Sequence, residues 1–70
     1  MDKNLLIYYM KRAEDSTDDL AAALGIHPLT LRDKINGKTE FKKSEIEAVI
    51  RRYDLTPEEV FKVFFTEADK

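Results

Sequence analysis

The sequence STDDLAAALGIHPLTLRDKING, residues 16–37, contains the start and stop signals of two short helices joined by a tight turn. Ser16, followed three residues later by Asp19, is a capping box that satisfies backbone N–H groups at a helix start. Gly25 is typical of a left-handed helix end, and Pro28 of a first helical position. The predicted helices cover residues 17–24 and 28–36. An ordinary αα-hairpin that binds nothing has similar spacing.

Three more helices are predicted by the same kinds of signal. Apolar residues recur at helical spacing from Leu6 to Ala13, and this face is expected to pack on the helix over residues 17–24. Ser44 with Glu47 is a second capping box, and a third, with proline at the first helical position, opens the last helix. These helices cover residues 3–13, 45–53 and 57–65. The prediction is a single all-α domain of five helices.

The C-terminal part has more apolar residues than one helix face can bury. Phe61 and Phe64 are expected to fill the core, and Phe41 to close it from the preceding loop. Val63 and Phe65 remain as candidates for a dimer interface. Alternatively, Phe65 folds back onto the first helix of its own chain. The crowding of β-branched and aromatic residues also allows a short strand after Phe61.

Composition excludes several classes of protein. The 70 residues include no cysteine, so neither a disulfide framework nor a thiolate metal site is expected. The single histidine, His27, is interpreted as a capping or surface residue, and the paired carboxylates fall in first helical turns, where they offset the helix dipole. We therefore expect no metal, no cofactor, no small-molecule ligand and no enzymatic activity. The apolar run at residues 5–10 is too short to span a bilayer, which favours a cytoplasmic protein without membrane contact.

Charge is distributed unevenly along the chain. The net charge is −2, yet residues 27–43 contain five lysines and arginines against two acidic residues, a local charge of +3. A basic segment on an acidic body can bind phosphates, because more distant charges are screened. Solvation of a loop explains the same lysines without any ligand.

The segment LAAALGIHPLTLRDKINGK, residues 20–38, resembles the helix-turn-helix domain of the lambdoid phage repressor, Cro and XRE-type transcriptional regulators. The likeness extends over roughly residues 6–61. Its most diagnostic elements are Leu20-Ala21, Leu24-Gly25-Ile26, Thr30-Leu31 and Ile35-Asn36-Gly37-Lys38. The resemblance implies a compact lambda-repressor-like fold and a homodimer that binds double-stranded DNA at a near-palindromic operator. It also implies a repressor of phage or prophage origin.

The resemblance implies a role for individual residues, because in these proteins the second helix crosses the DNA backbone and the third enters the major groove. The residues expected to face bases are Thr17, Leu29, Thr30, Arg32 and Asp33. The residues expected to contact phosphates are Ser16, Lys34, Asn36, Lys38, Lys42 and Lys43. Simpler roles remain open for Ser16 as a cap and for Leu29 as an isolated surface leucine.

Two residues depart from the family pattern. Pro28 stands where relatives often have a side chain that donates a hydrogen bond to a base. Asp33 would repel phosphates unless it accepts from a cytosine amino group or pairs with a basic neighbour. The alternative function is a protein-interaction or antitoxin-like module that keeps the fold and binds DNA weakly or not at all.

Overall fold

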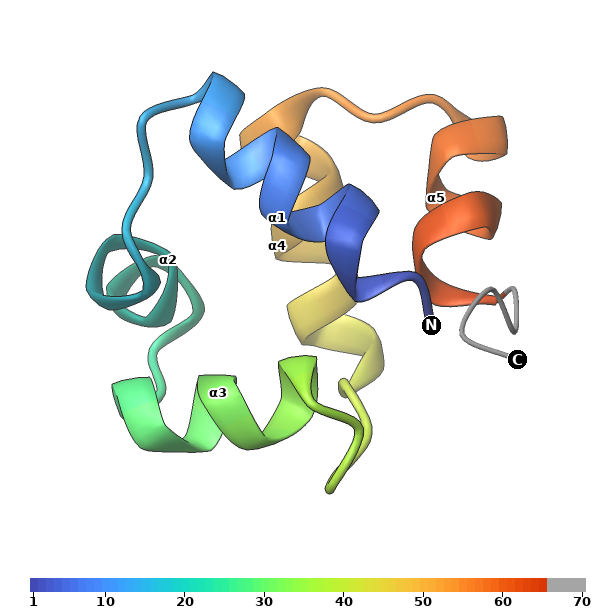
Figure 1. Cartoon of the computed structure of the whole chain (residues 1–70). Coiled ribbons are helices and arrows are strands. Elements are labelled where there is room, and N and C mark those ends of the chain that lie inside the picture. Colours follow the sequence, from blue (N-terminus) through green and yellow to red (C-terminus); the bar gives the residue numbers. More distant parts are fainter. Residues whose placement is uncertain (66–70) are drawn as a thin grey trace.

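The computed structural model of the protein describes residues 1–65, and these form five helices (Figure 1). The helices are α1 (Lys3–Arg12), α2 (Thr17–Leu24), α3 (Pro28–Ile35), α4 (Lys43–Tyr53) and α5 (Pro57–Phe64). The all-α prediction is confirmed for this part of the chain. The alternative of a short strand after Phe61 is wrong, because α5 continues to Phe64. Helices α1, α3 and α5 each end one residue before their predicted ends.

Two of the three predicted capping boxes are present. At the start of α2, the Asp19 N–H donates to Ser16 Oγ and the Ser16 N–H donates to Asp19 Oδ2, both at 3.0 Å. At the start of α5, Glu59 and Thr56 exchange the same pair of bonds, at 3.2 and 2.8 Å. These caps fix where the two helices begin.

The predicted box of Ser44 with Glu47 is wrong. Helix α4 begins two residues earlier than expected, because the Lys42 N–H donates to Glu45 Oε1 at 2.8 Å. The cap residue and the carboxylate are still three residues apart, but the pair lies two positions earlier in the sequence than predicted. Lys42 therefore lies immediately before the helix and Lys43 in its first turn.

The turn between α2 and α3 has the geometry that the sequence predicts. Gly25 adopts the left-handed conformation with φ +73°, and the Ile26 N–H donates to the Ala21 carbonyl at 3.0 Å. His27 caps α3, since its Nδ1 accepts from the Leu29 N–H at 3.1 Å. Helix α2 is seen end-on in Figure 1 while α3 lies in the plane, so the two cross at a steep angle.

Replacing Gly25 with alanine is expected to lower the free energy of unfolding by about 1 kcal/mol, because L side chains are strained in the left-handed region. A Cβ at this position would meet nothing within 4 Å, so backbone strain is the whole effect. Gly25→Asn, which tolerates this conformation better, should lose less than half as much. Equilibrium urea unfolding measures both variants. An alanine variant as stable as the unchanged protein would contradict this account.

All five helices contribute to one core. The fully buried side chains are Leu6, Leu20, Ala21, Leu31, Val49 and Val63. Phe41 and Phe64 are partly buried against this core with their rings edge to face at 5.4 Å, so Phe41 closes the core from the loop as predicted. Phe61 does not fill the core, because its side chain is 59% exposed, and Ala13 is also exposed.

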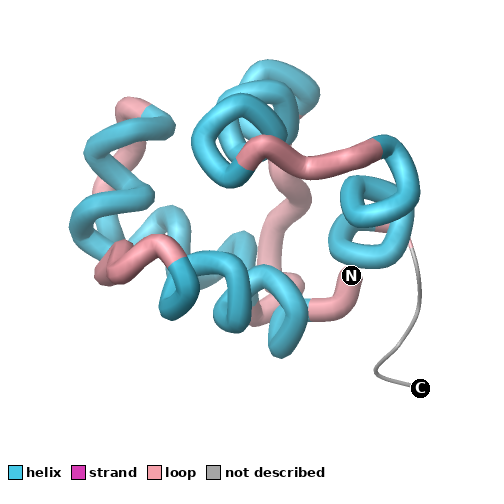
Figure 2. The backbone as a smooth tube through the Cα atoms, turned by 90° about the horizontal axis from the view of Figure 1, so that it is seen from above, coloured by secondary structure: helices cyan, strands magenta, loops and turns pink. Residues whose placement is uncertain are grey.

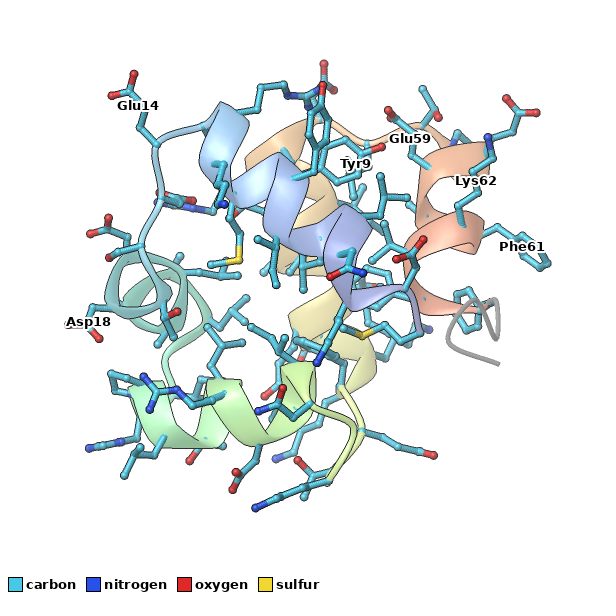
Figure 3. The ribbon with its side chains drawn as sticks, viewed as in Figure 1. Tyr9, Glu14, Asp18, Glu59, Phe61 and Lys62 are labelled. Carbon is cyan, nitrogen blue, oxygen red and sulfur yellow. The ribbon has the colours of Figure 1, made fainter. Side chains whose placement is uncertain are left out.

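Helix α5 is joined to the N-terminal part of the chain by two hydrogen bonds. The Tyr9 hydroxyl of α1 donates to Glu59 Oε2 at 3.0 Å (Figure 3), and the Asp2 N–H donates to the Val63 carbonyl at 2.8 Å. Figure 2 shows the N-terminus beside α5 from a second direction. These two bonds therefore hold the first and last helices together.

Candidate nucleic-acid interface

Helix α3 has one buried face and one exposed face. Leu31 is fully buried, whereas Leu29 is 58% exposed and Thr30 and Arg32 are also exposed. Asp33 is half-buried on the flank of the helix. The structure thus leaves Leu29, Thr30 and Arg32 accessible on α3, with the carboxylate of Asp33 less so.

A hollow of about 440 Å³ lies between α1, the start of α2 and the end of α3. It brings together four residues that the sequence assigned to DNA contact: Ser16, Thr17, Arg32 and Asn36. Lys11 of α1 also lines the hollow and was missed, because α1 was interpreted only as a packing helix. The hollow is therefore lined by two cations, by the acidic residue Asp15 and by the hydroxyls at the start of α2, and its remaining lining is mostly apolar.

Negative charge at the start of α2 opposes an anion there. The carboxylate of Asp18 is exposed and points away from the body of the molecule (Figure 3). The carboxylate of Asp19 is occupied by the capping bond to the Ser16 N–H. The helix dipole and the cations Lys11 and Arg32 favour a phosphate, and Asp18 weakens that preference.

Asp15, in the link before α2, is held by two residues of α4. Its carboxylate accepts from Arg52 Nε at 2.6 Å, from a second nitrogen of Arg52 at 2.8 Å and from the Tyr53 hydroxyl at 2.7 Å. The bonds from Arg52 keep the pKa of Asp15 below its usual value; burial opposes this and the Tyr53 bond adds to it. No local sequence pattern indicates this contact, which anchors the start of α2.

Lys34 is not the surface residue that the sequence predicts. Its side chain is 7% exposed, and its ammonium lies 3.1 Å from Glu45 Oε1 and donates to the Glu40 carbonyl at 3.0 Å. The prediction of a phosphate contact is wrong for Lys34, because its charge is buried against α4. Its spacing of three residues from Leu31 was the signal that it faces inward.

The other predicted phosphate contacts remain accessible. Lys38 and Lys42 are exposed in the loop between α3 and α4, Lys43 is exposed at the start of α4, and Ser16 and Asn36 are exposed at helix ends. We call Lys38, Lys42 and Lys43 the basic loop group. Together with Arg32 they provide four accessible positive charges near α3.

The two residues predicted for a dimer interface, Val63 and Phe65, differ in their exposure to solvent. Val63 has no exposed surface and belongs to the core, so its assignment to an interface is wrong. Phe65 is 61% exposed, and its ring lies 6.4 Å from that of Phe61. Figure 3 shows Phe61 pointing away from the molecule. The exposed apolar surface of α5 is therefore formed by Phe61 and Phe65.

Residues 1–65 thus form an all-α domain of five short helices in which a helix, a three-residue turn and a second helix are exposed on one side. Within these residues no group of three or more His, Cys, Asp or Glu side chains could hold a metal ion. None of the described helices has the length and apolar character needed to cross a membrane. No family model matches the chain, and searches of curated proteins and of solved structures found no match either.

Proposed function

We propose that this protein is a sequence-specific DNA-binding transcriptional regulator that inserts α3 into the major groove. The observation that carries the proposal is the exposure of Leu29, Thr30 and Arg32 on α3, directly after a three-residue turn from α2. The sequence resemblance to lambdoid phage repressor, Cro and XRE-type regulators supports it, as does the five-helix architecture. In this proposal the domain has the lambda-repressor-like fold and represses by occupying an operator.

Each accessible side chain has a role that its chemistry suits. Leu29 contacts a thymine methyl group, Thr30 reaches a base or a phosphate, and Arg32 donates to a guanine edge. Thr17 lines the hollow, and Ser16 and Asn36 donate hydrogen bonds to the DNA backbone there. The basic loop group follows the phosphates of the same strand.

Phe61 and Phe65 provide the contact for a homodimer on DNA. In a two-fold dimer the two α3 helices would lie one DNA turn apart, roughly 34 Å, which requires a near-palindromic operator. No cofactor is needed for this mechanism.

Selection from a random DNA pool, followed by titration at several salt concentrations, tests the proposal. We expect one preferred sequence and an affinity that falls steeply with salt, because lysines and arginines release counterions from phosphates. In the variant Asp33→Asn, a changed base preference would show that the carboxylate reads cytosine, and stronger binding to all sequences would show that it only repels DNA. An affinity that does not depend on salt, with no DNA sequence preferred over others, would refute the proposal that the protein is a regulator.

A protein-interaction module is the second candidate, favoured by the exposed aromatic rings of Phe61 and Phe65. In an antitoxin-like protein these rings would contact a different protein, and α3 would have no duplex to read. The same salt titration separates the two candidates.

A further inference from the structure

The buried pair of Lys34 and Glu45 joins three segments of the chain. Lys34 belongs to α3, Glu45 to the first turn of α4, and the ammonium of Lys34 also holds the Glu40 carbonyl of the connecting loop. Glu45 Oε1 in turn accepts from the Lys42 N–H at 2.8 Å. One ammonium and one carboxylate therefore hold the second half of the loop between α3 and α4, from Glu40 to Lys42.

Burial makes this arrangement more specific than a surface ion pair. Both side chains are 7% exposed, so neither charge is solvated and each depends on its partner. Burial acts to raise the pKa of Glu45, but the bonds from the Lys42 N–H and from Lys34 outweigh it, and the pKa is lowered. The carboxylate therefore stays charged and keeps its hold on the loop at neutral pH.

The neighbours of this pair are the side chains that the DNA-binding proposal needs. Lys42 is bonded directly to Glu45 through its backbone, Lys43 follows it, and Lys38 lies in the same loop. A lysine carries its point charge on a flexible four-carbon stem, so the position of its backbone sets the region in which the ammonium can meet a phosphate.

We propose that Lys34 is a positioning residue that, through Glu45 and the Glu40 carbonyl, holds Lys42 and Lys43 of the basic loop group beside α3 for contact with the DNA backbone. This inference rests on the proposed function and reassigns Lys34 from a phosphate ligand to a residue that places other phosphate ligands. It predicts that loss of the pair affects the loop even when the fold is retained.

Two variants, one single and one combined, separate this role from general stability. Lys34→Met leaves the Glu45 carboxylate buried without a cation, with only the bond from the Lys42 N–H, so the equilibrium constant for unfolding should rise at least about 100-fold. Lys34→Met combined with Glu45→Gln removes both charges and keeps an acceptor for the Lys42 N–H, so most of the stability should return. The combined variant is then folded but has no ammonium on the Glu40 carbonyl.

Amide hydrogen exchange in the combined variant tests the loop without DNA. Although the Glu45→Gln side chain still offers it an acceptor, the Lys42 N–H should exchange at least about 10-fold faster relative to the Lys38 N–H, because Lys34 no longer holds the loop at the Glu40 carbonyl. The Lys38 N–H is bonded to the Asp33 carbonyl near the end of α3 and does not use the pair. Lys38→Met is the matched control, since it removes an exposed lysine and should leave the exchange of Lys42 unchanged. An unchanged ratio in the combined variant overturns the inference.

DNA titration completes the test. The slope of log K against log salt reports the number of phosphate contacts. With Lys38→Met this slope should fall by the equivalent of about one contact. With the combined variant it should fall by about two contacts or more, because Lys42 and Lys43 both lose their position. If the combined variant lost the equivalent of one contact in the salt slope while the exchange of the Lys42 N–H stayed unchanged, Lys34 itself would be a phosphate ligand. If that exchange became faster while the slope stayed unchanged, Lys34 would have no role in DNA binding. Failure of the proposed function is recognised separately: the protein without any substitution would then show no salt-dependent DNA binding.

Discussion

Asp15→Ala is expected to lower the free energy of unfolding by about 2 to 3 kcal/mol, a third or more of the stability typical of a domain of this size. The substitution removes an acceptor that Arg52 and Tyr53 share, at distances of 2.6 to 2.8 Å. Two of these three residues are well buried, because the Asp15 side chain is 9% exposed and Tyr53 is 5% exposed, while the Arg52 side chain is 36% exposed. The expected loss is therefore smaller than for a fully buried ion pair.

Acidity should remove part of this stability from the unchanged protein. The pKa of Asp15 is lowered in the folded state, so its contribution is complete above the pKa of the unfolded chain, about 4, and is lost as pH falls through the folded value. Chemical unfolding at pH 7 and at pH 3 measures this. The difference between the unchanged protein and Asp15→Ala should shrink at pH 3. Glu45 and Glu59, whose pKa values are also lowered, contribute equally to both proteins.

Asp18→Ala is the matched control for this prediction. Asp18 lies three residues further along the chain, in the first turn of α2, but its side chain is exposed. Its loss should change stability by about 0.5 kcal/mol through the helix dipole alone. Equal effects of the two alanine variants would show that the contact with α4 does not hold the link in place.

The positions of helices could be predicted because their signals are local. Ser16, Gly25 and Pro28 each specify a backbone conformation within a few residues, and the structure has helix ends at these sites. The start of α4 was missed because Lys42 with Glu45 and Ser44 with Glu47 have the same spacing. Only the packing of Glu45 against Lys34 selects the first of these registers, and packing is not a local property.

The contacts that position the candidate interface could not be predicted in this way. Asp15 meets Arg52 across 37 residues of sequence, and a pattern with a helical period carries no information about that distance. In α5 the spacing of Val60, Val63 and Phe64 does mark the inward face, but the preference for placing aromatic residues inside favoured Phe61 instead. The helical period of the apolar residues is therefore a better guide to the inward face of α5 than the size and hydrophobicity of the individual side chains.

The correction in α5 leads to the second large effect. Replacing Phe61 and Phe65 together by serine is expected to weaken a homodimer at least about 100-fold, or about 2.7 kcal/mol. Both rings are about 60% exposed and lie 6.4 Å apart, so a partner could cover them as one apolar surface. Sedimentation equilibrium of the unchanged and the double variant measures the dissociation constant. Affinity for a palindromic operator should fall with it, while affinity for a single half-site should not.

Two controls make this result specific to α5. Tyr8→Ser removes an aromatic ring that is 55% exposed on α1 and should leave the dissociation constant unchanged. Phe64→Ser removes a ring that packs on Phe41 and the core, and should cost about 3 kcal/mol of stability. The double serine variant should lose about 1 kcal/mol or less, because most of both rings is already in water. A double variant that still dimerises would place the homodimer contact on another surface, and Phe61 and Phe65 would then be free for the heterologous partner of an interaction module.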